Sequence, residues 1–384
     1  MKVALLTNDN REPHKQYART EPYFGTAPEA LLQGFAALPE VEVHIVSCIR
    51  QPVRSPEKIA PNIFFHSLVV PKIGWMRTGY QGCIRAVRKK LKALQPDIVH
   101  GQGTELDCGI SAAFSGFPNV ITIHGNMQAI AELYHSRIGS FHWVAGRLET
   151  LALRRAGGVF CNSAYTENCV RPRTPKIWRV PNALRPAFFD RPKVAPISDR
   201  PILLNIGSTL TYKRQIEILE MAGALWRQGL KFEIQFAGER ALASAYGAAF
   251  TQKLAAAERD GYARHLGMLD TAQLVTALDA ASALVHFPTE EAFGLVVAEA
   301  LARNLKLFGA ATGGVVDIAS GVDGAELFPA EDFPALTAAL ARWLTAGCPQ
   351  PGLAAAAMRQ RYHPEVVARR HLEIYREVLA VTNA

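Results

Sequence analysis

The segment Ser282–Ala302, which reads SALVHFPTEEAFGLVVAEALA, decides how the rest of this chain is interpreted. It opens with a short apolar run, which predicts a buried strand, and continues into a Pro-Thr-Glu-Glu loop. After Gly294 the apolar residues recur at helical spacing, which predicts the start of a helix. Ligands of open α/β sheets bind at the carboxyl ends of the strands. We therefore expect Glu290, Glu291 and the free amides of the helix start to face a ligand.

A further acid extends this pattern into the predicted helix. Glu299 follows Glu291 with seven residues between them, about one and a half helical turns after Gly294. Carboxylates on both sides of free helix amides suit two groups of hydroxyls with a phosphate between them. Acids near a helix start can also simply stabilise the helix dipole, and for an isolated pair that explanation is the commoner one.

Length and composition indicate a globular protein with two domains. The chain has 384 residues, 49% of them hydrophobic and 20% charged. Its apolar runs are too short to cross a membrane, and Met1 opens directly into a strand pattern rather than a signal peptide. We therefore expect a cytoplasmic location. The six cysteines form no C-x2-C pair, which argues against a zinc site and a disulfide framework and favours reduced thiols.

Positive charge is concentrated in the first half of the chain. Residues 1–190 hold 23 Lys and Arg against 14 Asp and Glu, whereas residues 191–384 hold 19 against 20. The densest basic stretch is residues 85–92, RAVRKKLK, where a solvated helix face is the commoner explanation. The functional alternative is peripheral contact with an anionic membrane at its inner face. No nucleic-acid motif accompanies the charge, so we expect no nucleic-acid partner.

Two histidines, Lys213 and a linker complete the pattern. His100 and His124 each end a predicted strand and precede glycine, where an imidazole can bond a sugar hydroxyl or a phosphate. For an isolated histidine, a structural role is commoner. Lys213 precedes a predicted helix and suits a diphosphate, although an exposed lysine there is more often plain surface. Asp190–Pro201, with three prolines and no periodicity, is the expected linker.

Glu291, Phe293, Gly294, Leu295 and Glu299 together resemble the E-x-F-G-L-x-x-x-E signature of family 4 glycosyltransferases. These are retaining enzymes of the GT-B architecture. Three further segments resemble the family: Thr122–Gly125 is like its T-x-H-G, Gly207–Lys213 is like its G-R-L-x-x-x-K with Ser208 in place of the arginine, and His265–Leu269 is like the segment beside the nucleotide base. Either Arg214 compensates for the missing arginine, or phosphate binding is weaker or differently arranged.

The resemblance implies an α/β fold of GT-B type, with two Rossmann-like domains whose parallel sheets face a central cleft. Residues 1–190 would bind the acceptor, residues 191–363 the nucleotide-sugar, and helix 364–384 would cross back to the first domain. The implied catalytic residues are His124 and Glu291. The donor-binding residues would be Gly207, Lys213, Arg214, Gly267, Phe293, Gly294, Leu295 and Glu299.

The expected reaction is metal-independent transfer of a hexose-type sugar from a UDP- or GDP-sugar to a glycan or a lipid-linked acceptor. Such a reaction fits cell-envelope or exopolysaccharide synthesis. No D-x-D metal motif occurs, and no cofactor is expected beyond the nucleotide-sugar substrate. Two alternatives stay open: a GT-B epimerase or hydrolase of sugar nucleotides, and a non-catalytic nucleotide-sugar binding protein. A nicotinamide dehydrogenase is disfavoured because G-x-G-x-x-G is absent.

Overall fold

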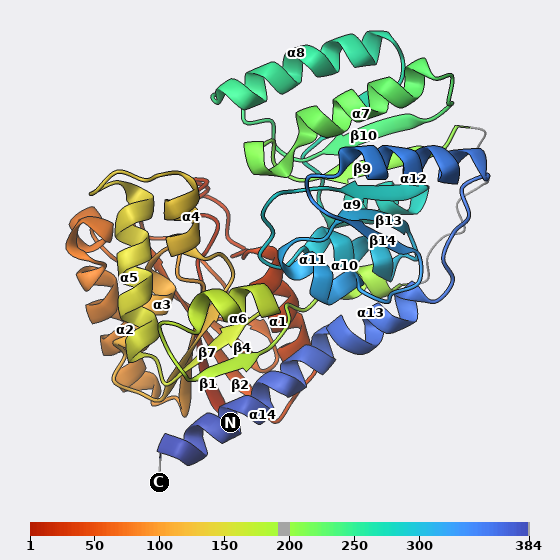
Figure 1. Ribbon diagram of the computed structural model, residues 1–384. Helices are drawn as coiled ribbons and strands as arrows, with labels where there is room; N and C mark the ends of the chain where they lie inside the picture. The colour runs from red at the N-terminus through yellow and green to blue at the C-terminus, as the bar shows by residue number, and fades with distance from the viewer. Residues whose placement is uncertain (191–199, 383–384) are drawn as a thin grey trace. The chain divides into compact units, whose positions relative to one another are not determined.

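The computed structural model describes residues 1–190 and 200–382, which form two compact units (Figure 1). Unit 1 comprises Met1–Arg185 and Tyr362–Ala384, and unit 2 comprises Pro186–Arg361. Most of the predicted linker 190–201 lies outside the described residues. Within the described chain, no helix is both long and apolar enough to cross a membrane.

Unit 1 is built on an eight-stranded sheet in the order β3-β4-β2-β1-β5-β6-β7-β8. All neighbouring strands pair in parallel except β3 and β4. The strands are β1 (Lys2–Leu6), β2 (Glu42–Ile49), β3 (Lys58–Ala60), β4 (Ile63–Val69), β5 (Ile98–Gln102), β6 (Asn119–Ile123), β7 (Gly158–Cys161) and β8 (Ile177–Arg179). The sequence of residues 51–80 suggests an irregular segment, and this prediction is wrong because β3 and β4 lie within it. Its Pro and aromatic residues obscured the strand pattern of Ile63–Val69.

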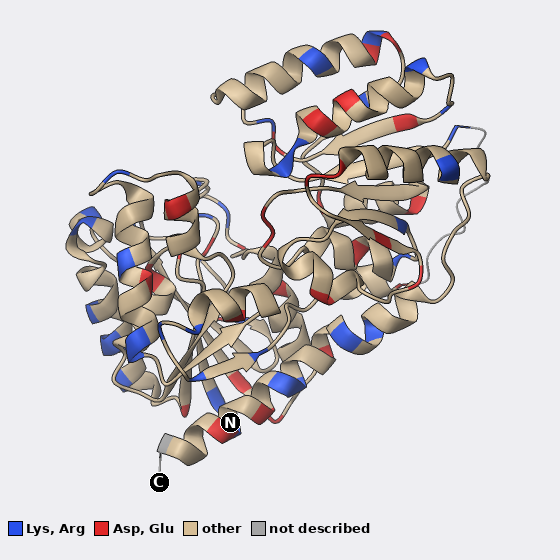
Figure 2. Cartoon of the chain, viewed as in Figure 1, with Lys and Arg blue, Asp and Glu red and all other residues tan. Residues whose placement is uncertain are grey.

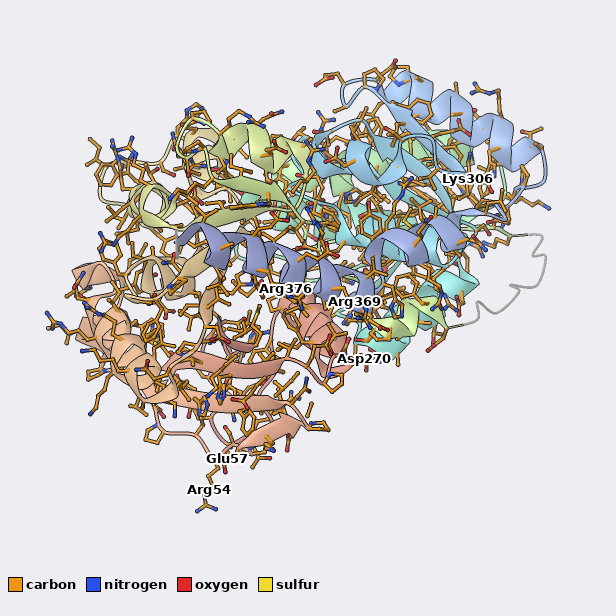
Figure 3. All side chains as sticks on the ribbon, turned by 90° about the horizontal axis from the view of Figure 1, so that it is seen from below. Arg54, Glu57, Asp270, Lys306, Arg369 and Arg376 are labelled. Carbon is orange, nitrogen blue, oxygen red and sulfur yellow. The ribbon has the colours of Figure 1, made fainter. Side chains whose placement is uncertain are left out.

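Helices cover both faces of this sheet. One face packs against α1 and α14, and the other against α2, α3 and α5 (Figure 1). Figure 3 views α14 from outside, with Arg369 and Arg376 on its exposed side. The helices of unit 1 are α1 (Thr26–Ala36), α2 (Gln81–Leu94), α3 (Asp107–Ala113), α4 (Met127–Leu133), α5 (Phe141–Arg155), α6 (Ala164–Val170) and α14 (Pro364–Thr382), with short 3-10 turns at Lys72–Gly74 and Met76–Thr78.

Unit 2 is built on a six-stranded, wholly parallel sheet in the order β11-β10-β9-β12-β13-β14. Its strands are β9 (Ile202–Ile206), β10 (Glu233–Ala237), β11 (Ala263–Gly267), β12 (Ala283–His286), β13 (Lys306–Ala310) and β14 (Ala325–Phe328). Its helices are α7 (Gln215–Arg227), α8 (Ala245–Arg259), α9 (Thr271–Ala280), α10 (Leu295–Ala302), α11 (Gly313–Ala319), α12 (Phe333–Thr345) and α13 (Ala354–Tyr362, whose last residue belongs to unit 1), with 3-10 turns at Pro186–Phe189 and Thr211–Lys213. The central strands β9, β12 and β13 bring their carboxyl ends to one edge, where ligand sites of such sheets form.

All six cysteines carry free thiols, four of them buried. This agrees with the scattered positions of the cysteines in the sequence. Cys48, Cys83 and Asp107 are the described metal-ligand candidates close enough to share an ion, and all three are buried in unit 1.

Candidate active site

The loop between β12 and α10 carries the main site residues of unit 2. Strand β12 lies inside the sheet between β9 and β13, and each of its residues is buried. The Thr289 amide donates to the Tyr212 carbonyl at 2.8 Å, which ties this loop to the one after β9. Gly294 has a φ of 97° and caps α10, a backbone conformation that strongly favours glycine. The predicted strand, loop and helix are therefore confirmed within a residue at each end.

Two basic side chains hold Glu291. Its Oε2 atom lies 2.6 Å from Lys213 Nζ and 2.9 Å from His286 Nε2. Its side chain is only 14% exposed. Within the described chain, the other carboxylate oxygen, Oε1, makes no hydrogen bond. Glu291 thus has one oxygen fixed by the protein and one left to accept a hydrogen bond.

The environment keeps Glu291 ionised. Burial acts to raise the pKa of this carboxyl, but the His286 hydrogen bond and the Lys213 charge outweigh it and set the pKa at about 2. Burial lowers the pKa of His286, so near neutral pH its imidazole is uncharged and donates Nε2–H to Glu291. The local charge is therefore one carboxylate beside one ammonium.

Gly313 and Gly314 pack against the same loop. The Gly314 amide donates to the Glu291 carbonyl at 3.0 Å. Gly313 has a φ of 48°, and a Cβ there would lie 1.8 Å from the Glu291 carbonyl oxygen. A Cβ at Gly314 would lie 2.6 Å from Phe293 backbone atoms. The two glycines are thus required for the close approach of this turn to the loop that carries Glu291.

Lys213 and Arg214 point to different partners. Lys213 ends a 3-10 turn and reaches Glu291, whereas Arg214 caps α7 with a φ of 57°. The Arg214 guanidinium donates to the Ala330 carbonyl and lies 5.5 Å above the Phe333 ring. Ser208, at the position of the expected arginine, is exposed. Lys213 is therefore the cation beside Glu291 in this structure.

The remaining predicted residues of unit 2 lie in strand-end loops or in α10. Gly207 follows β9, and its carbonyl would clash at 2.3 Å with any Cβ at Gly238. Gly267 ends β11 with a φ of 76°, and its amide donates to His265 Nδ1 at 3.0 Å. Glu299 is in α10 and is 2% exposed.

In unit 1, His124 follows β6 and is held by neutral partners. Its Nε2–H donates to Gln102 Oε1 at 2.9 Å, and Asn182 lies near the ring. Burial lowers the pKa of His124 to about 4, so the imidazole is uncharged near neutral pH. These residues, together with Thr122 and His371, line a small cavity.

His100 differs from His124. The prediction that it ends a strand is wrong, because β5 continues through Gly101 to Gln102 and places His100 in the middle of the strand. It is fully buried, with Nδ1 2.5 Å from the Tyr375 hydroxyl and Nε2 2.7 Å from Thr122 Oγ1. Both ring nitrogens are therefore used inside unit 1, where β5 meets α14. His100 has the structural role that an isolated histidine usually has.

Sequence reasoning missed three residues that shape these loops. The sequence around His286 indicates only a strand, although His286 is the second partner of Glu291. Glu105 accepts from the Gly125 amide at 2.8 Å and so fixes the turn after His124. Glu149 accepts from the Thr104 hydroxyl at 2.6 Å and the Met127 amide at 3.0 Å, which anchors the start of α4. His286 ends β12 and His124 directly follows β6, and this shared position at a strand end could have identified His286.

Two family models match consecutive parts of the chain. Residues 29–188 match Glycosyltransferase Family 4, and residues 187–360 match Glycosyl transferases group 1. No curated protein sequence matches the chain.

Several solved structures share the fold over nearly the whole chain. Sucrose-phosphate synthase from Thermosynechococcus elongatus has a TM-score of 0.77 at 18% identity, covering 99% of this chain and 100% of that one. HepE of Anabaena in complex with UDP-glucose has a TM-score of 0.68 at 14% identity, covering 98% and 100%. The lipopolysaccharide outer core galactosyltransferase WaaB, in its apo form, has a TM-score of 0.67 at 14% identity, with the same coverage. These similarities confirm the predicted fold class of two parallel-sheet α/β domains of GT-B type.

Proposed function

Because the chain carries both domains of a GT-B glycosyltransferase, we propose that it moves a hexose-type sugar from a nucleotide-sugar to a glycan or lipid-linked acceptor with retention of configuration. The observation that carries this proposal is the Glu291 carboxylate, held ionised by Lys213 and His286 with one oxygen left over. An ionised carboxylate accepts hydrogen bonds from sugar hydroxyls and does not act as an acid near neutral pH. This carboxylate is therefore suited to orient a donor sugar rather than to protonate a leaving group.

Lys213 is proposed to bind the donor diphosphate. An ammonium group has three N–H donors, and Glu291 uses one of them. We propose that the other two donate to phosphate oxygens at the turn Phe293–Leu295, which leads into α10. Arg214 joins them only if it leaves the Ala330 carbonyl. Charge neutralisation by these groups gives a transfer that needs no metal ion and no cofactor besides the donor.

The remaining assignments follow the family pattern. We assign Glu299 to the nucleotide ribose, Gly267 to the neighbourhood of the base, and Gly207 to the diphosphate loop. His124 is assigned to the transferred sugar. The uncharged His124 ring hydrogen-bonds hydroxyls without adding a second positive charge.

Retention is proposed to occur with the leaving and attacking groups on the same face of the sugar, the departing phosphate taking the acceptor proton. Holding both reactants in this geometry supplies up to about 7 to 11 kcal/mol of the barrier. Glu291 and Glu299 thus act as hydrogen-bond acceptors rather than as the acid and base of a hydrolase.

The relatives support a UDP-sugar as donor and an envelope glycan as acceptor. HepE was solved with UDP-glucose, and WaaB is a galactosyltransferase of the lipopolysaccharide outer core. By analogy we propose a UDP-hexose as the first donor to test, with a GDP-hexose second. A lipid-linked acceptor places the reaction at the inner face of a membrane, which the basic first half of the chain also favours.

The first experiment compares Glu291→Gln with wild type. We expect the variant to lose at least about 100-fold in kcat, because it replaces the ionised acceptor with a neutral amide. Its melting temperature should still rise with UDP, since Glu291 is not assigned to the nucleotide. Glu331→Gln, an exposed acid of the same unit, is the matched control and should transfer like wild type.

A donor screen by thermal shift separates the alternatives. A ligand at about 100 times its dissociation constant stabilises the folded chain by about 2.7 kcal/mol. Binding with turnover only when an acceptor is present supports transfer, whereas turnover without acceptor indicates a hydrolase or an epimerase. Binding without any product indicates a non-catalytic protein. This outcome is tested because Ser208 stands where the family pattern has an arginine. Full activity of Glu291→Gln would refute the proposed role of this acid.

A further inference from the structure

A cavity of about 740 Å³ lies beside α4 and α5 in unit 1, apart from the residues assigned to transfer. Its lining includes Arg147, Arg154 and Arg173, with Trp143 beside them. Glu132 is the acid among the lining residues, so the lining has more positive than negative charge. A cavity of this size and charge suits an anionic group.

Two of the arginines remain available to a ligand. In the described part of the chain, neither Arg147 nor Arg154 forms an ion pair, and both are exposed. The Arg147 guanidinium lies 5.2 Å above the Trp143 ring. Arginine presents a fork of N–H donors that matches phosphate oxygens.

Arg173 supplies an unused donor in the same lining. Its side chain is 7% exposed and pairs with Glu149 at 2.5 Å. Its Nε–H group is buried and has no hydrogen-bond partner among the described residues. Glu149 already accepts from Thr104 and Met127, so its oxygens are in use. Arg173 therefore adds a third guanidinium to the lining, with an Nε–H donor that the described residues leave unpaired.

Exposed apolar side chains adjoin this cavity along the chain. Leu133 is 48% exposed, Tyr134 50%, Ile138 85% and Phe141 47%, all within the nine residues from the last of α4 to the first of α5. The Tyr134 ring stacks on His142 at 5.4 Å, so this connection is folded against the start of α5. Apolar side chains next to arginines are the combination that inserts at the surface of an anionic bilayer.

The basic helix α2 provides an internal comparison. Figure 2 shows blue residues along α2 and α5, on the same side of unit 1. The large apolar side chains of α2, such as Ile84, Val87 and Leu91, are buried against the sheet. Helix α2 therefore presents charge without an apolar anchor, as expected for a solvated face.

We propose that the cavity beside α4 and α5 binds the phosphate headgroup of an anionic lipid while the segment Leu133–Phe141 inserts into the bilayer surface. This deepens the proposed function, because it rests on the proposed membrane location and names the residues that dock the chain there. The donor screen tests transfer and the vesicle experiment tests docking, so the two proposals can fail separately. The positive charge of the cavity favours an anionic lipid headgroup. The exposed apolar segment favours a bilayer over a soluble phosphate as the partner.

Vesicle flotation of the full chain tests the proposal. Wild type should float with phosphatidylcholine vesicles containing about a third phosphatidylglycerol, and far less with phosphatidylcholine alone. The double variant Arg147→Glu/Arg154→Glu should reduce the bound fraction at least about fivefold, and so should Ile138→Ser. The matched controls are Arg85→Glu/Arg88→Glu on α2 and Ile73→Ser, an apolar residue 76% exposed elsewhere in unit 1. Both controls should float like wild type.

Three results would overturn the proposal. Wild type that ignores anionic vesicles excludes lipid docking. Equal losses for the α2 reversal and the cavity reversal indicate diffuse attraction without a site. The third experiment measures by calorimetry the binding of glycerol 1-phosphate, a headgroup without acyl chains. If it binds wild type but not the cavity variant, and wild type does not float with vesicles, the cavity is assigned to a soluble phosphate. Unchanged melting temperatures of all variants establish that each loss is one of docking and not of folding.

Discussion

The pKa values of Glu105, near His124, and of Glu291, beside His286, are shifted in opposite directions, although each acid lies in a loop near the end of a parallel strand. Glu291 in unit 2 is paired with Lys213, and its pKa falls to about 2. Glu105 in unit 1 accepts from backbone amides such as that of Gly125, and burial raises its pKa. The His286 hydrogen bond and the Lys213 charge outweigh the effect of burial on the pKa of Glu291. Backbone amides alone do not outweigh it for Glu105.

The two histidines also differ in the charge of their hydrogen-bond partners. His286 donates to a carboxylate, whereas His124 donates to the neutral Gln102. The strand end at His286 in unit 2 therefore has fixed charge beside it, and the one at His124 in unit 1 has uncharged polar groups. Elsewhere unit 1 also holds charge, such as the buried Asp9–Arg11 pair after β1. Fixed charges suit a diphosphate, and uncharged donors and acceptors suit sugar hydroxyls. The contrast between the two strand ends is consistent with nucleotide-sugar binding by unit 2.

Acid should weaken unit 1 through His371 at a higher pH than it acts on the Glu291 carboxylate. Burial lowers the pKa of His371 from 6.5 to about 4, so between these values the unfolded chain binds more protons than the folded one. Stability linked to His371 is thus present above pH 6.5 and is lost as the pH falls toward 4, by about 2 kcal/mol at pH 5. Glu291, with a pKa of about 2 against 4.5, loses its contribution only between pH 4.5 and 2.

Urea unfolding at pH 7 and pH 5 measures this loss, and hydrogen exchange, corrected for intrinsic rates, locates it. His371→Gln removes the titrating ring and should show a smaller difference between the two pH values, even if it is less stable at pH 7. If the free energy of unfolding falls equally between pH 7 and pH 5 in wild type and variant, folded His371 already carries a proton at pH 5. Its contrast with the Glu291 carboxylate would then fail.

Removal of the Lys213 charge should weaken donor binding by about 10- to 100-fold, because a charge-assisted bond contributes about 1.5 to 3 kcal/mol. Lys213→Met keeps the length of the side chain and removes the ammonium. Lys231→Met, at an exposed position of the same unit, is the control. Calorimetry with the nucleotide-sugar measures both variants. Equal affinities would show that the amides of α10, or a repositioned Arg214, meet the diphosphate charge without Lys213.

The unit 2 site was predictable because its signals are local in sequence. The segment Ser282–Ala302 contains the strand, the loop, the Gly294 cap and Glu291 in one continuous pattern. Helical spacing and a single glycine were enough to place α10. Lys213 was also found, since a lysine before a helix start after a strand is a recognisable position. Its direct bond to Glu291, across 78 residues of sequence, was not predictable from spacing.

What the sequence did not reveal depends on burial and on long-range pairing. His100 and His124 have the same local pattern, yet only His100 is enclosed by Tyr375, a residue 275 positions away. The Glu149–Arg173 pair and its unused Nε–H donor likewise require the folded positions of α5 and the segment after α6. Ser208 raised the question whether Arg214 replaces the missing arginine, and only the structure shows its guanidinium turned to Ala330.

The smallest predicted effect concerns His124. His124→Asn keeps a hydrogen-bond donor but shortens the side chain, so we expect kcat to fall about tenfold with donor affinity little changed. Because burial sets the pKa of His124 at about 4, activity should show no decline attributable to this ring between pH 8 and 5.5. The contrary result is a wild-type rate that falls with a midpoint near pH 6.5. If this pH dependence disappears in His124→Asn but persists in the exposed control His14→Asn, His124 titrates as an ordinary histidine. The contrast between the charged surroundings of His286 and the uncharged surroundings of His124 would then no longer hold.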